Sequence, residues 1–320
     1  MSSPSAPRRK PTRARPRVVA ISNQKGGEGK TTTAVNLAAS LAAGEHRVLL
    51  VDLDPQANAS SSVGYPRGAV KAGTYELVLG GARFADVVRP TELPSLWVVP
   101  ASADLAGAEV ELVNLEDRET ALTRALAPVL EGSDYDFVIF DCPPSLGLLT
   151  INALVASDRV IIPMQAKYFS LEGLGALKGT IDAIRTGLNP RLAIEGIVFC
   201  MFDPRTNLAQ QVVNEVRQHF GDVVYETVVP INVRLSESPS FGKPALLYDI
   251  ESRGAQSYLQ LAREVLSRMK AAEAAAVASP EPETAAPAPT TPVRKKKAAA
   301  AAASDDATAK APAKKSKGAA

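Results

Sequence analysis

Short runs rich in Val, Ile and Leu recur through the middle of the chain, separated by longer stretches that mix apolar and polar residues at helical spacing. Runs that are apolar at nearly every position are typical of strands buried on both faces of a sheet. We therefore predict strands at Val18–Ile21, Arg47–Asp54, Leu96–Pro100, Phe137–Asp141, Arg159–Pro163 and Ile194–Phe202.

The stretches between these runs predict helices at Thr32–Ala43, Glu119–Leu130, Leu171–Thr186 and Leu208–Phe220. Strands that alternate with helices favour an α/β fold with a doubly wound, mostly parallel sheet and helices on both faces. Ligands of such sheets bind at the carboxyl ends of the strands. We therefore expect the functional residues of the chain at those ends.

The two ends of the chain differ from the middle in composition. Residues 1–17 are mainly Ser, Pro, Arg and Lys with no acidic side chain, and residues 271–320 are rich in Ala, Pro, Lys and Thr. Neither segment has the apolar surface needed to offset the entropy of folding. We predict a disordered basic N-terminal arm at 1–17, one folded domain at 18–270 and a disordered tail at 271–320.

Charge and cysteine content narrow the possible functions. The formal net charge of the chain is +2, but the basic surplus lies in the two ends, so the predicted domain itself is acidic. Cys142 and Cys200 both fall in apolar runs, which predicts reduced core thiols of a cytosolic protein. No apolar run approaches the roughly 20 residues of a membrane span, and no secretory signal follows the N-terminal charges. We expect a cytoplasmic protein.

A glycine-rich loop follows the first predicted strand and leads directly into a helix. Its sequence at positions 23–32 is NQKGGEGKTT. Glycines let several backbone N–H groups point at one anion, and the N-terminus of the helix adds partial positive charge. Lys30 can reach the β- and γ-phosphates of a nucleotide, and the Thr31 hydroxyl can bind Mg²⁺. The pattern predicts a phosphate-binding loop.

This loop departs from the ordinary Walker pattern. Gln24 occupies the position of the first glycine, and the sequence instead matches KGGxGK followed by Thr, with an additional lysine at Lys25. A glycine-rich turn without a ligand is the plainer alternative. The preceding strand, the following helix and the two lysines disfavour it.

Two aspartates at strand ends complete the predicted site. Asp54 is the last residue of the run VLLVDLD, and Asp141 ends the run FVIFD. A carboxylate that leaves a buried strand is costly unless a metal, a water or a cation compensates it. Asp54 is best placed to face the phosphates, and Asp141 has the position of a Walker B residue that holds Mg²⁺.

From about Val18 to Lys270, the chain resembles the ParA/MinD group of deviant Walker ATPases. The resemblance is carried by NQKGGEGKTTTAVNLAASLA, RVLLVDLDPQANAS and DYDFVIFDCPPSLGLLTINAL. A further segment, NVRLSESPSFGKPALLYDIESRGAQSYLQLAREV, is typical of the ParA/Soj chromosome-partitioning family rather than of MinD.

The resemblance implies ATP and Mg²⁺ as cofactors and a role for each site residue. Lys25 matches a signature lysine that crosses to the nucleotide of the partner subunit in an ATP-bound homodimer. With Lys30 and Asp54 it forms the implied catalytic set, and Thr31, Asp54 and Asp141 form the implied metal site. The implied nucleotide-binding residues are Lys25, Gly26, Gly27, Glu28, Gly29, Lys30, Thr31 and Thr32, with adenine near Met201, Pro230, Ile231 and Asn232.

The resemblance also implies partners. Members of the family bind DNA without sequence preference as ATP-bound dimers, and a ParB-like centromere-binding protein stimulates their hydrolysis. Arg205 and Arg234 match that DNA-binding role here, with Arg253 as a third candidate, because a phosphate contact needs only charge and reach. The implied function is a cytoplasmic, nucleoid-associated ATPase that segregates chromosomal or plasmid DNA.

Two positions depart from the family pattern. Glu28 replaces the small apolar residue, usually Val, that the family has between the glycines. Because a carboxylate facing the triphosphate would repel it, we predict that Glu28 points away from the nucleotide, toward Lys25 or an arginine of the interface. Ile231 stands where many relatives have a basic residue, which removes one possible DNA contact.

Other functions stay open from sequence alone. An ATPase that positions a protein cargo along the nucleoid would use the same residues. Recruitment to a membrane, as in MinD, would need bulky apolar residues in a C-terminal amphipathic helix, whereas the tail is mainly alanine. ATP-dependent amide or biotin-pathway ligases and the nitrogenase iron protein share the architecture. The basic ends either supplement DNA binding or act as solubilising linkers.

Overall fold

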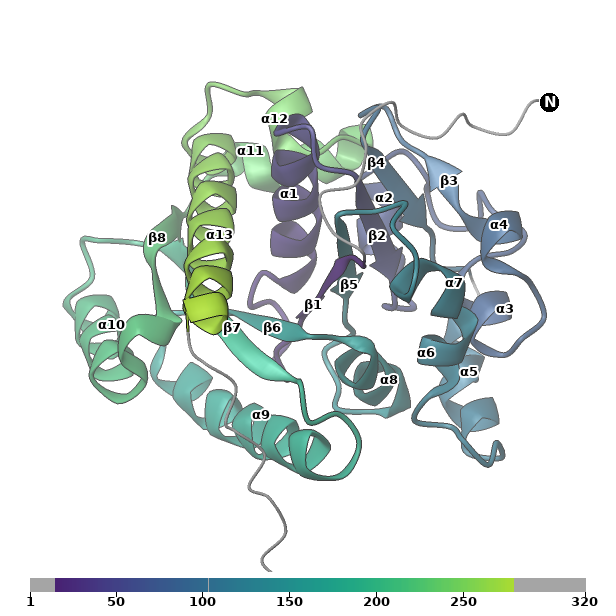
Figure 1. The fold of residues 1–320 in the computed structure, drawn as a ribbon. Helices are drawn as coiled ribbons and strands as arrows, with labels where there is room; N and C mark the ends of the chain where they lie inside the picture. The colour runs from purple at the N-terminus through teal and green to yellow at the C-terminus, as the bar shows by residue number, and fades with distance from the viewer. Residues whose placement is uncertain (1–14, 103, 279–320) are drawn as a thin grey trace, which may run out of the picture. The chain divides into compact units, whose positions relative to one another are not determined.

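One sheet organises the part of the chain that the computed structural model describes, residues 15–102 and 104–278. Its eight strands have the order β3-β4-β2-β5-β1-β6-β7-β8 (Figure 1). All neighbouring strands are parallel except β3 and β4, so the predicted doubly wound, mostly parallel sheet is confirmed. The strands are β1 (Arg17–Ile21), β2 (Val48–Asp52), β3 (Arg89–Pro90), β4 (Leu96–Val99), β5 (Phe137–Asp141), β6 (Arg159–Gln165), β7 (Ala193–Phe202) and β8 (Val224–Pro230).

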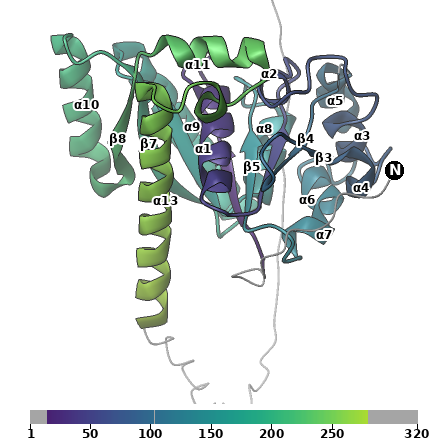
Figure 2. The same cartoon turned by 90° about the horizontal axis from the view of Figure 1, so that it is seen from above.

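Helices cover both faces of this sheet. α1 (Lys30–Ala43) and α13 (Arg253–Ala278) lie on one face, and α8 (Leu148–Ala156) and α9 (Tyr168–Gly187) lie on the other (Figures 1 and 2). The remaining helices are α2 (Asn58–Ser61), α3 (Thr74–Val78), α4 (Phe84–Val87), α5 (Leu105–Leu112), α6 (Ala121–Ala125), α7 (Ala127–Leu130), α10 (Asn207–Phe220), α11 (Val233–Glu237) and α12 (Ala245–Tyr248). Two 3₁₀ turns, η1 (Gly221–Val223) and η2 (Ser238–Phe241), complete the described elements.

The central strands are apolar because each of them contributes side chains to two hydrophobic cores, one on each face of the sheet. In β1, Val18 and Ala20 join the core beneath α8 and α9, whereas Val19 and Ile21 join the core beneath α1 and α13. Successive side chains of a strand point to opposite faces, so a centrally placed strand needs apolar residues at every position. The pattern in the sequence thus reports burial on both sides of the sheet.

The observed elements differ from the predicted ones in a few places. The single helix predicted at Glu119–Leu130 is wrong: α6 and α7 are separate, and Pro128 stands in the first turn of α7, where its missing N–H is tolerated. β2 ends at Asp52 rather than Asp54. β3 and β8 were not predicted, and β8 mixes polar residues into its run because it is an edge strand.

The described chain continues past the predicted domain limits of 18 and 270. Arg15 forms an ion pair with Asp158, Arg17 begins β1, and α13 extends to Ala278 in an alanine-rich segment that favours helix. Residues 1–14 and 279–320 lie outside the described part, and so do most of the predicted arm and tail. No helix in the described residues is long and apolar enough to cross a membrane.

A close approach between two strands generates a stability prediction. Gly196 on β7 is buried, and a Cβ there would lie 2.3 Å from a ring carbon of Tyr225, which is itself fully buried on β8. Because the ring has no free space to enter, Gly196→Ala should lower the free energy of unfolding by about 1–3 kcal/mol, as overpacked cores do. Urea denaturation followed by circular dichroism measures this change.

Gly179→Ala is the matched control for this substitution. Gly179 is exposed in the interior of α9, and a Cβ there meets nothing within 4 Å. The change should be neutral or stabilising by up to about 1 kcal/mol, because alanine is the better helix former. A Gly196→Ala protein as stable as the Gly179→Ala protein would contradict the packing argument.

Candidate nucleotide-binding site

Three adjacent parallel strands bring the candidate residues together at their carboxyl ends. β5 pairs in register with β1 on one side and β2 on the other, so Asp141 lies opposite Ile21 and Asp52. The chain leaves β1 after Ile21 and passes through the loop at 22–29 into α1. The predicted phosphate loop therefore starts directly beside Asp141.

The loop is held in shape by its own backbone and by a neighbouring strand. Gly27 and Gly29 have φ angles of +74° and +91°, which residues with a side chain rarely adopt. The side-chain oxygen of Asn23 accepts the Lys25 N–H at 3.1 Å, and its amide donates to the Pro163 carbonyl of β6 at 2.7 Å. Asn23 therefore anchors the start of the loop to the sheet.

Lys30 points back into the loop. Its ammonium donates a hydrogen bond to the Lys25 carbonyl at 3.0 Å, and the residue is 6% exposed. Burial lowers the pKa of Lys30, and the nearby carboxylates of Asp141 and Asp54 oppose that effect. A buried ammonium beside loop N–H groups suits a polyanion such as a triphosphate.

Asp141 is a buried carboxylate whose charge the protein compensates only in part, through the nearby Lys30 ammonium and Thr31 hydroxyl. It is fully buried, and neither of its oxygens accepts a hydrogen bond within the described part of the chain. Burial raises its pKa well above the ordinary value, the nearby Asp52 adds to the rise, and the Thr31 hydroxyl opposes it. An orphaned carboxylate next to a phosphate loop and a threonine hydroxyl has the chemistry of a Mg²⁺ site.

Asp52 and Asp54 have different surroundings. Asp52 is fully buried, and its carboxylate accepts hydrogen bonds from the N–H and hydroxyl of Ser60 and from the Asp54 N–H. Burial raises the pKa of Asp52 to about 6, although these hydrogen bonds lower it. The Asp54 carboxylate accepts only the Gln56 N–H among the described residues, at 2.9 Å. Asp52 is thus engaged in the fold, and Asp54 has acceptor capacity left.

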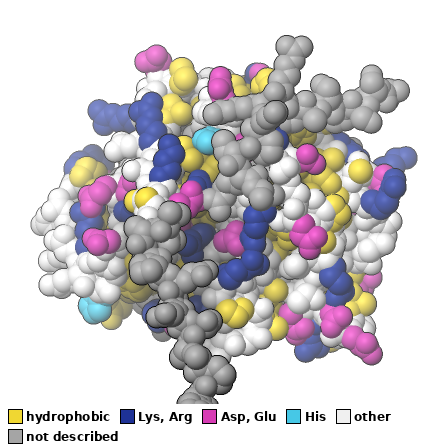
Figure 3. Space-filling view, in the orientation of Figure 1, with side chains coloured by type: hydrophobic (Ala, Val, Ile, Leu, Met, Phe, Trp, Pro, Cys, Tyr) yellow, Lys and Arg dark blue, Asp and Glu magenta, His cyan; other side chains and the backbone are white. Residues whose placement is uncertain are grey.

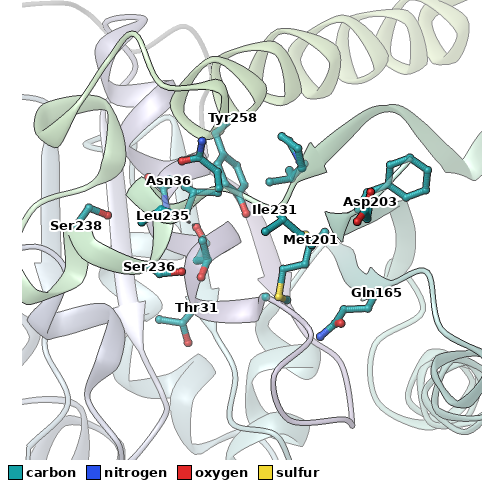
Figure 4. A pocket seen from close by; sticks show the side chains of 18 of the residues that line it. Thr31, Asn36, Gln165, Met201, Asp203, Ile231, Leu235, Ser236, Ser238 and Tyr258 are labelled. Carbon is teal, nitrogen blue, oxygen red and sulfur yellow. Dashed lines mark hydrogen bonds between the residues drawn. The ribbon is translucent and has the colours of Figure 1, made fainter. Parts of the chain in front are cut away.

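A cavity of about 1000 Å³ opens next to the loop. It is lined by Gly29, Thr31 and Thr32 at the start of α1, by Met201 at the end of β7, and by Pro230, Ile231 and Asn232 after β8 (Figure 4). Met201 has a φ of +51°, a conformation uncommon for a residue with a side chain. The structure thus brings the predicted adenine-binding residues and the end of the phosphate loop to one cavity.

Glu28 is buried, and its carboxylate faces Lys25 at 3.3 Å. It also accepts hydrogen bonds from the Gln165 N–H at the end of β6 and from the Ser170 hydroxyl in α9. Of the two partners predicted for Glu28, Lys25 or an arginine of the interface, the structure shows Lys25; its orientation relative to a bound nucleotide stays a prediction. The sequence predicted neither Gln165 nor Ser170 as a neighbour of the loop.

Arg205 and Arg234, two of the predicted DNA contacts, form ion pairs within the chain. Arg205 is 87% exposed and binds both oxygens of Asp203, and its hydrogen bonds lower the pKa of that carboxyl group to about 2. Arg234 pairs with Glu237 and Asp249. Exposed ion pairs of this kind contribute little free energy, so a phosphate group can compete for either arginine.

Arg253, the third predicted DNA contact, is exposed at the first residue of α13. It makes no ion pair with the described part of the chain. On the face drawn in Figure 3, Lys and Arg side chains lie among Asp and Glu rather than in one broad basic patch. DNA binding by the three arginines stays a prediction.

A buried polar contact beneath the loop was missed by the sequence reasoning. The Thr33 hydroxyl of α1 lies 3.1 Å from the Tyr258 hydroxyl of α13 and 3.6 Å from the Cys200 sulfur of β7. Burial raises the pKa of the Cys200 thiol to about 11, in keeping with the predicted core thiol. Periodicity within a helix cannot show such a contact, because its partners are far apart in sequence.

Comparison with known proteins gives a consistent set of relatives. A family model described as an AAA domain matches residues 16–194. The chain is 57% identical to the chromosome partitioning protein ParA of Myxococcus xanthus, over 79% of this chain and 88% of that protein. It is 53% identical to the sporulation initiation inhibitor protein Soj of Bacillus subtilis, over 78% of this chain and 98% of that protein.

A solved structure is also similar. The cobyrinic acid a,c-diamide synthase of Mycobacterium smegmatis, with bound ADP and magnesium, has a TM-score of 0.70 and 35% identity, and the match covers 80% of this chain and 96% of that one. Fold and site define a P-loop nucleotide-binding protein with a two-lysine loop. With more than half of its aligned residues identical to those of ParA and Soj, the chain belongs to the ParA/Soj family of chromosome-partitioning proteins.

The orphaned carboxylate leads to a second stability prediction. Asp141→Asn should raise the free energy of unfolding of the nucleotide-free chain by about 1–2 kcal/mol at pH 8, because it removes a buried charge whose burial the nearby Lys30 ammonium and Thr31 hydroxyl offset only in part. The pKa of Asp141 is higher in the folded chain than in the unfolded chain, so protonation stabilises the fold at low pH and that stabilisation is lost as pH rises. The gain should therefore be larger at pH 8 than at pH 5, as measured by urea denaturation.

Asp136→Asn, next to the start of the same strand, is the control with the opposite sign. Asp136 is buried and accepts hydrogen bonds from the backbone and guanidinium of Arg47, and although burial raises its pKa, these bonds lower it overall. Its substitution leaves a buried arginine without its charge partner and should cost about 3 kcal/mol. A loss of stability in both variants would contradict the view that Asp141 is only partly compensated.

Proposed function

We propose that this chain is a Mg²⁺-dependent ATPase that segregates DNA by cycling between a DNA-bound ATP dimer and released ADP monomers. The observation that carries the proposal is the meeting of Lys30 and the orphaned Asp141 at the phosphate loop of a chain 57% identical to a partitioning protein. The loop supports binding of a phosphate anion, and the similarity to a partitioning protein supports a role in DNA segregation.

Nucleotide binding follows from the site. The loop N–H groups and Lys30 would hold the phosphates, and the cavity at Met201, Pro230 and Asn232 would take the adenosine. Thr31, Asp54 and Asp141 would hold Mg²⁺, directly or through water. A bound ion would supply positive charge against the negative charge that develops on the phosphates during hydrolysis. The magnesium and ADP of the similar solved structure support this assignment.

Hydrolysis is assigned to residues of two subunits. Asp54 keeps acceptor capacity at the edge of the loop and would orient the attacking water. Lys25, whose side chain is 41% exposed, would reach the nucleotide of the partner subunit and stabilise the transferring phosphoryl group. This arrangement links turnover to dimerisation, so ATP holds the dimer together and hydrolysis releases it.

DNA binding is assigned to Arg205, Arg234 and Arg253 of the ATP-bound dimer. Two subunits double the number of phosphate contacts, which makes the affinity depend steeply on dimerisation. A ParB-like centromere-binding protein would stimulate hydrolysis and so release the ATPase from DNA. The chain would then act in the cytoplasm, on the nucleoid.

A metabolic function is the second candidate, because the similar solved structure is named for amide synthesis. Its identity of 35% is well below the 57% shared with the partitioning protein. DNA binding separates the two candidates, since an enzyme that amidates a small molecule has no use for it.

The proposed function predicts DNA binding that depends on ATP. Binding to a nonspecific duplex should be strong with ATP and Mg²⁺, weak with ADP and weak without nucleotide, because only the dimer combines both sets of arginines. The affinity should fall about tenfold or more between roughly 50 and 200 mM salt, because phosphate contacts release counterions. Fluorescence anisotropy with a labelled duplex measures both effects.

Two variants control for the origin of this binding. Asp54→Ala should remain bound to DNA in ATP because it hydrolyses slowly, and Lys30→Ala should not bind because it cannot hold the triphosphate. Equal DNA binding in all three nucleotide states would contradict the proposed switch and attribute the affinity to the basic ends. Absence of binding in every state would favour the metabolic candidate.

Arg205→Ala tests the assigned DNA contact. It should weaken ATP-dependent binding about threefold to tenfold and make the salt dependence shallower, because one phosphate contact per subunit is lost. Arg83→Ala is the matched control: Arg83 is 84% exposed and pairs with Asp86 much as Arg205 pairs with Asp203. Equal affinities of the two variants in the same anisotropy assay would remove Arg205 from the interface.

A further inference from the structure

Glu28 lies between Gly27 and Gly29 near the end of the phosphate loop and is almost fully buried, with 1% of its surface exposed. One carboxylate oxygen accepts the Gln165 N–H at the end of β6, and the other accepts the Ser170 hydroxyl in the first turn of α9 at 3.1 Å. The Gln165 side chain also donates to the Gly27 carbonyl at 2.7 Å. The loop is therefore fastened to the junction of β6 and α9 by Glu28 and by its neighbour Gly27.

Lys25 is the cation beside this carboxylate. Its ammonium lies 3.3 Å from the Glu28 oxygen, while the side chain itself is 41% exposed. In this ion pair, the Lys25 side chain is long and partly open to solvent, whereas the Glu28 carboxylate is buried. Lys30 is also near Glu28, but its ammonium is engaged with the Lys25 carbonyl.

We propose that Glu28 is a positioning residue for Lys25, which it holds over its own loop and so restrains from entering the site of a second copy of this chain. The inference rests on the proposed function, in which Lys25 serves the nucleotide of the partner subunit. Dimerisation must then break the contact between Lys25 and Glu28. Glu28 thereby sets how readily the ATP-bound dimer forms.

The free energy needed to separate Lys25 from Glu28 depends on how differently the two residues are buried. An exposed ion pair separates at little cost, because water solvates both charges. Here Lys25 regains water or meets phosphate when it leaves, but Glu28 stays buried and loses a cation partner. Removing the charge of Glu28 while keeping its side-chain shape should therefore favour the dimer.

Chemical labelling tests the contact in the free monomer. Full-length Glu28→Gln and unaltered protein are treated with an amine-acylating reagent without nucleotide, and modification of Lys25 is measured by mass spectrometry relative to Lys270. Lys270 is exposed at α13 and serves as the internal reference. Loss of the ion pair should raise the relative labelling of Lys25 about twofold to fivefold. An unchanged ratio would overturn the proposal.

Dimerisation tests the consequence. All proteins carry Asp54→Ala so that ATP persists, and the dimer dissociation constant in ATP and Mg²⁺ is measured by analytical ultracentrifugation. Glu28→Gln should tighten the dimer about threefold to tenfold. With Lys25→Ala also present, Glu28→Gln should have no effect on the dimer that remains, because its target is gone. Glu28→Val offers a second route to removing the charge if the glutamine variant folds poorly.

The outcomes separate this inference from the function on which it rests. If the Asp54→Ala chain does not dimerise with ATP, the proposed function fails and the inference fails with it. If that chain dimerises and Glu28→Gln leaves the dissociation constant unchanged, only the role of Glu28 is wrong. A shift that persists without Lys25 would also overturn it, because Glu28 would then act on the loop alone.

Discussion

The in-register pairing of β5 with β1 and β2 is the constraint on which the site depends. It fixes Asp141 at the level where the chain leaves β1 to form the phosphate loop, and it places Asp52 on the opposite side. A slip of one residue would turn Asp141 to the other face of the sheet and replace it with an apolar side chain. Pairing of β5 with a strand on each side therefore fixes the level at which Asp141 lies in the sheet.

The consequence of that position is a buried charge that is only partly compensated. Three aspartates lie near the loop and differ in the hydrogen bonds that their carboxylates accept. Asp52 accepts bonds from Ser60 and from the turn that follows it, and Asp54 accepts one from Gln56. Asp141 accepts none from the described residues. Buried carboxylates with so few hydrogen bonds are costly in the nucleotide-free chain. A cation, or a polyanion together with its cation, would lower that cost. We interpret this electrostatic imbalance as a cost in stability that a bound cation would offset.

Sequence reasoning predicted most of the sheet, because β1 and β5 are apolar at almost every position and few folds other than a doubly covered sheet need such short, uniformly apolar runs. The sequence favours Asp54 over Asp52 because Asp54 ends its run and matches the family pattern, and in the structure the Asp52 carboxylate is occupied by hydrogen bonds from Ser60 and Asp54. Sequence reasoning missed β8, because polar residues interrupt the apolar pattern by which a buried strand is predicted. It also missed Gln165 and Ser170 as neighbours of Glu28, because their contacts depend on how β6 and α9 approach the loop.

The contact between Thr33 and Tyr258 has a consequence for how the protein is made. The two residues are separated by 225 positions, and the strand that precedes the loop pairs with β5 and β6 rather than with its neighbours in sequence. A chain emerging from the ribosome therefore exposes its first strand and first helix long before their partners exist. The packing beneath the phosphate loop is therefore complete only after residues near the far end of the domain have been synthesised and α13 contacts α1.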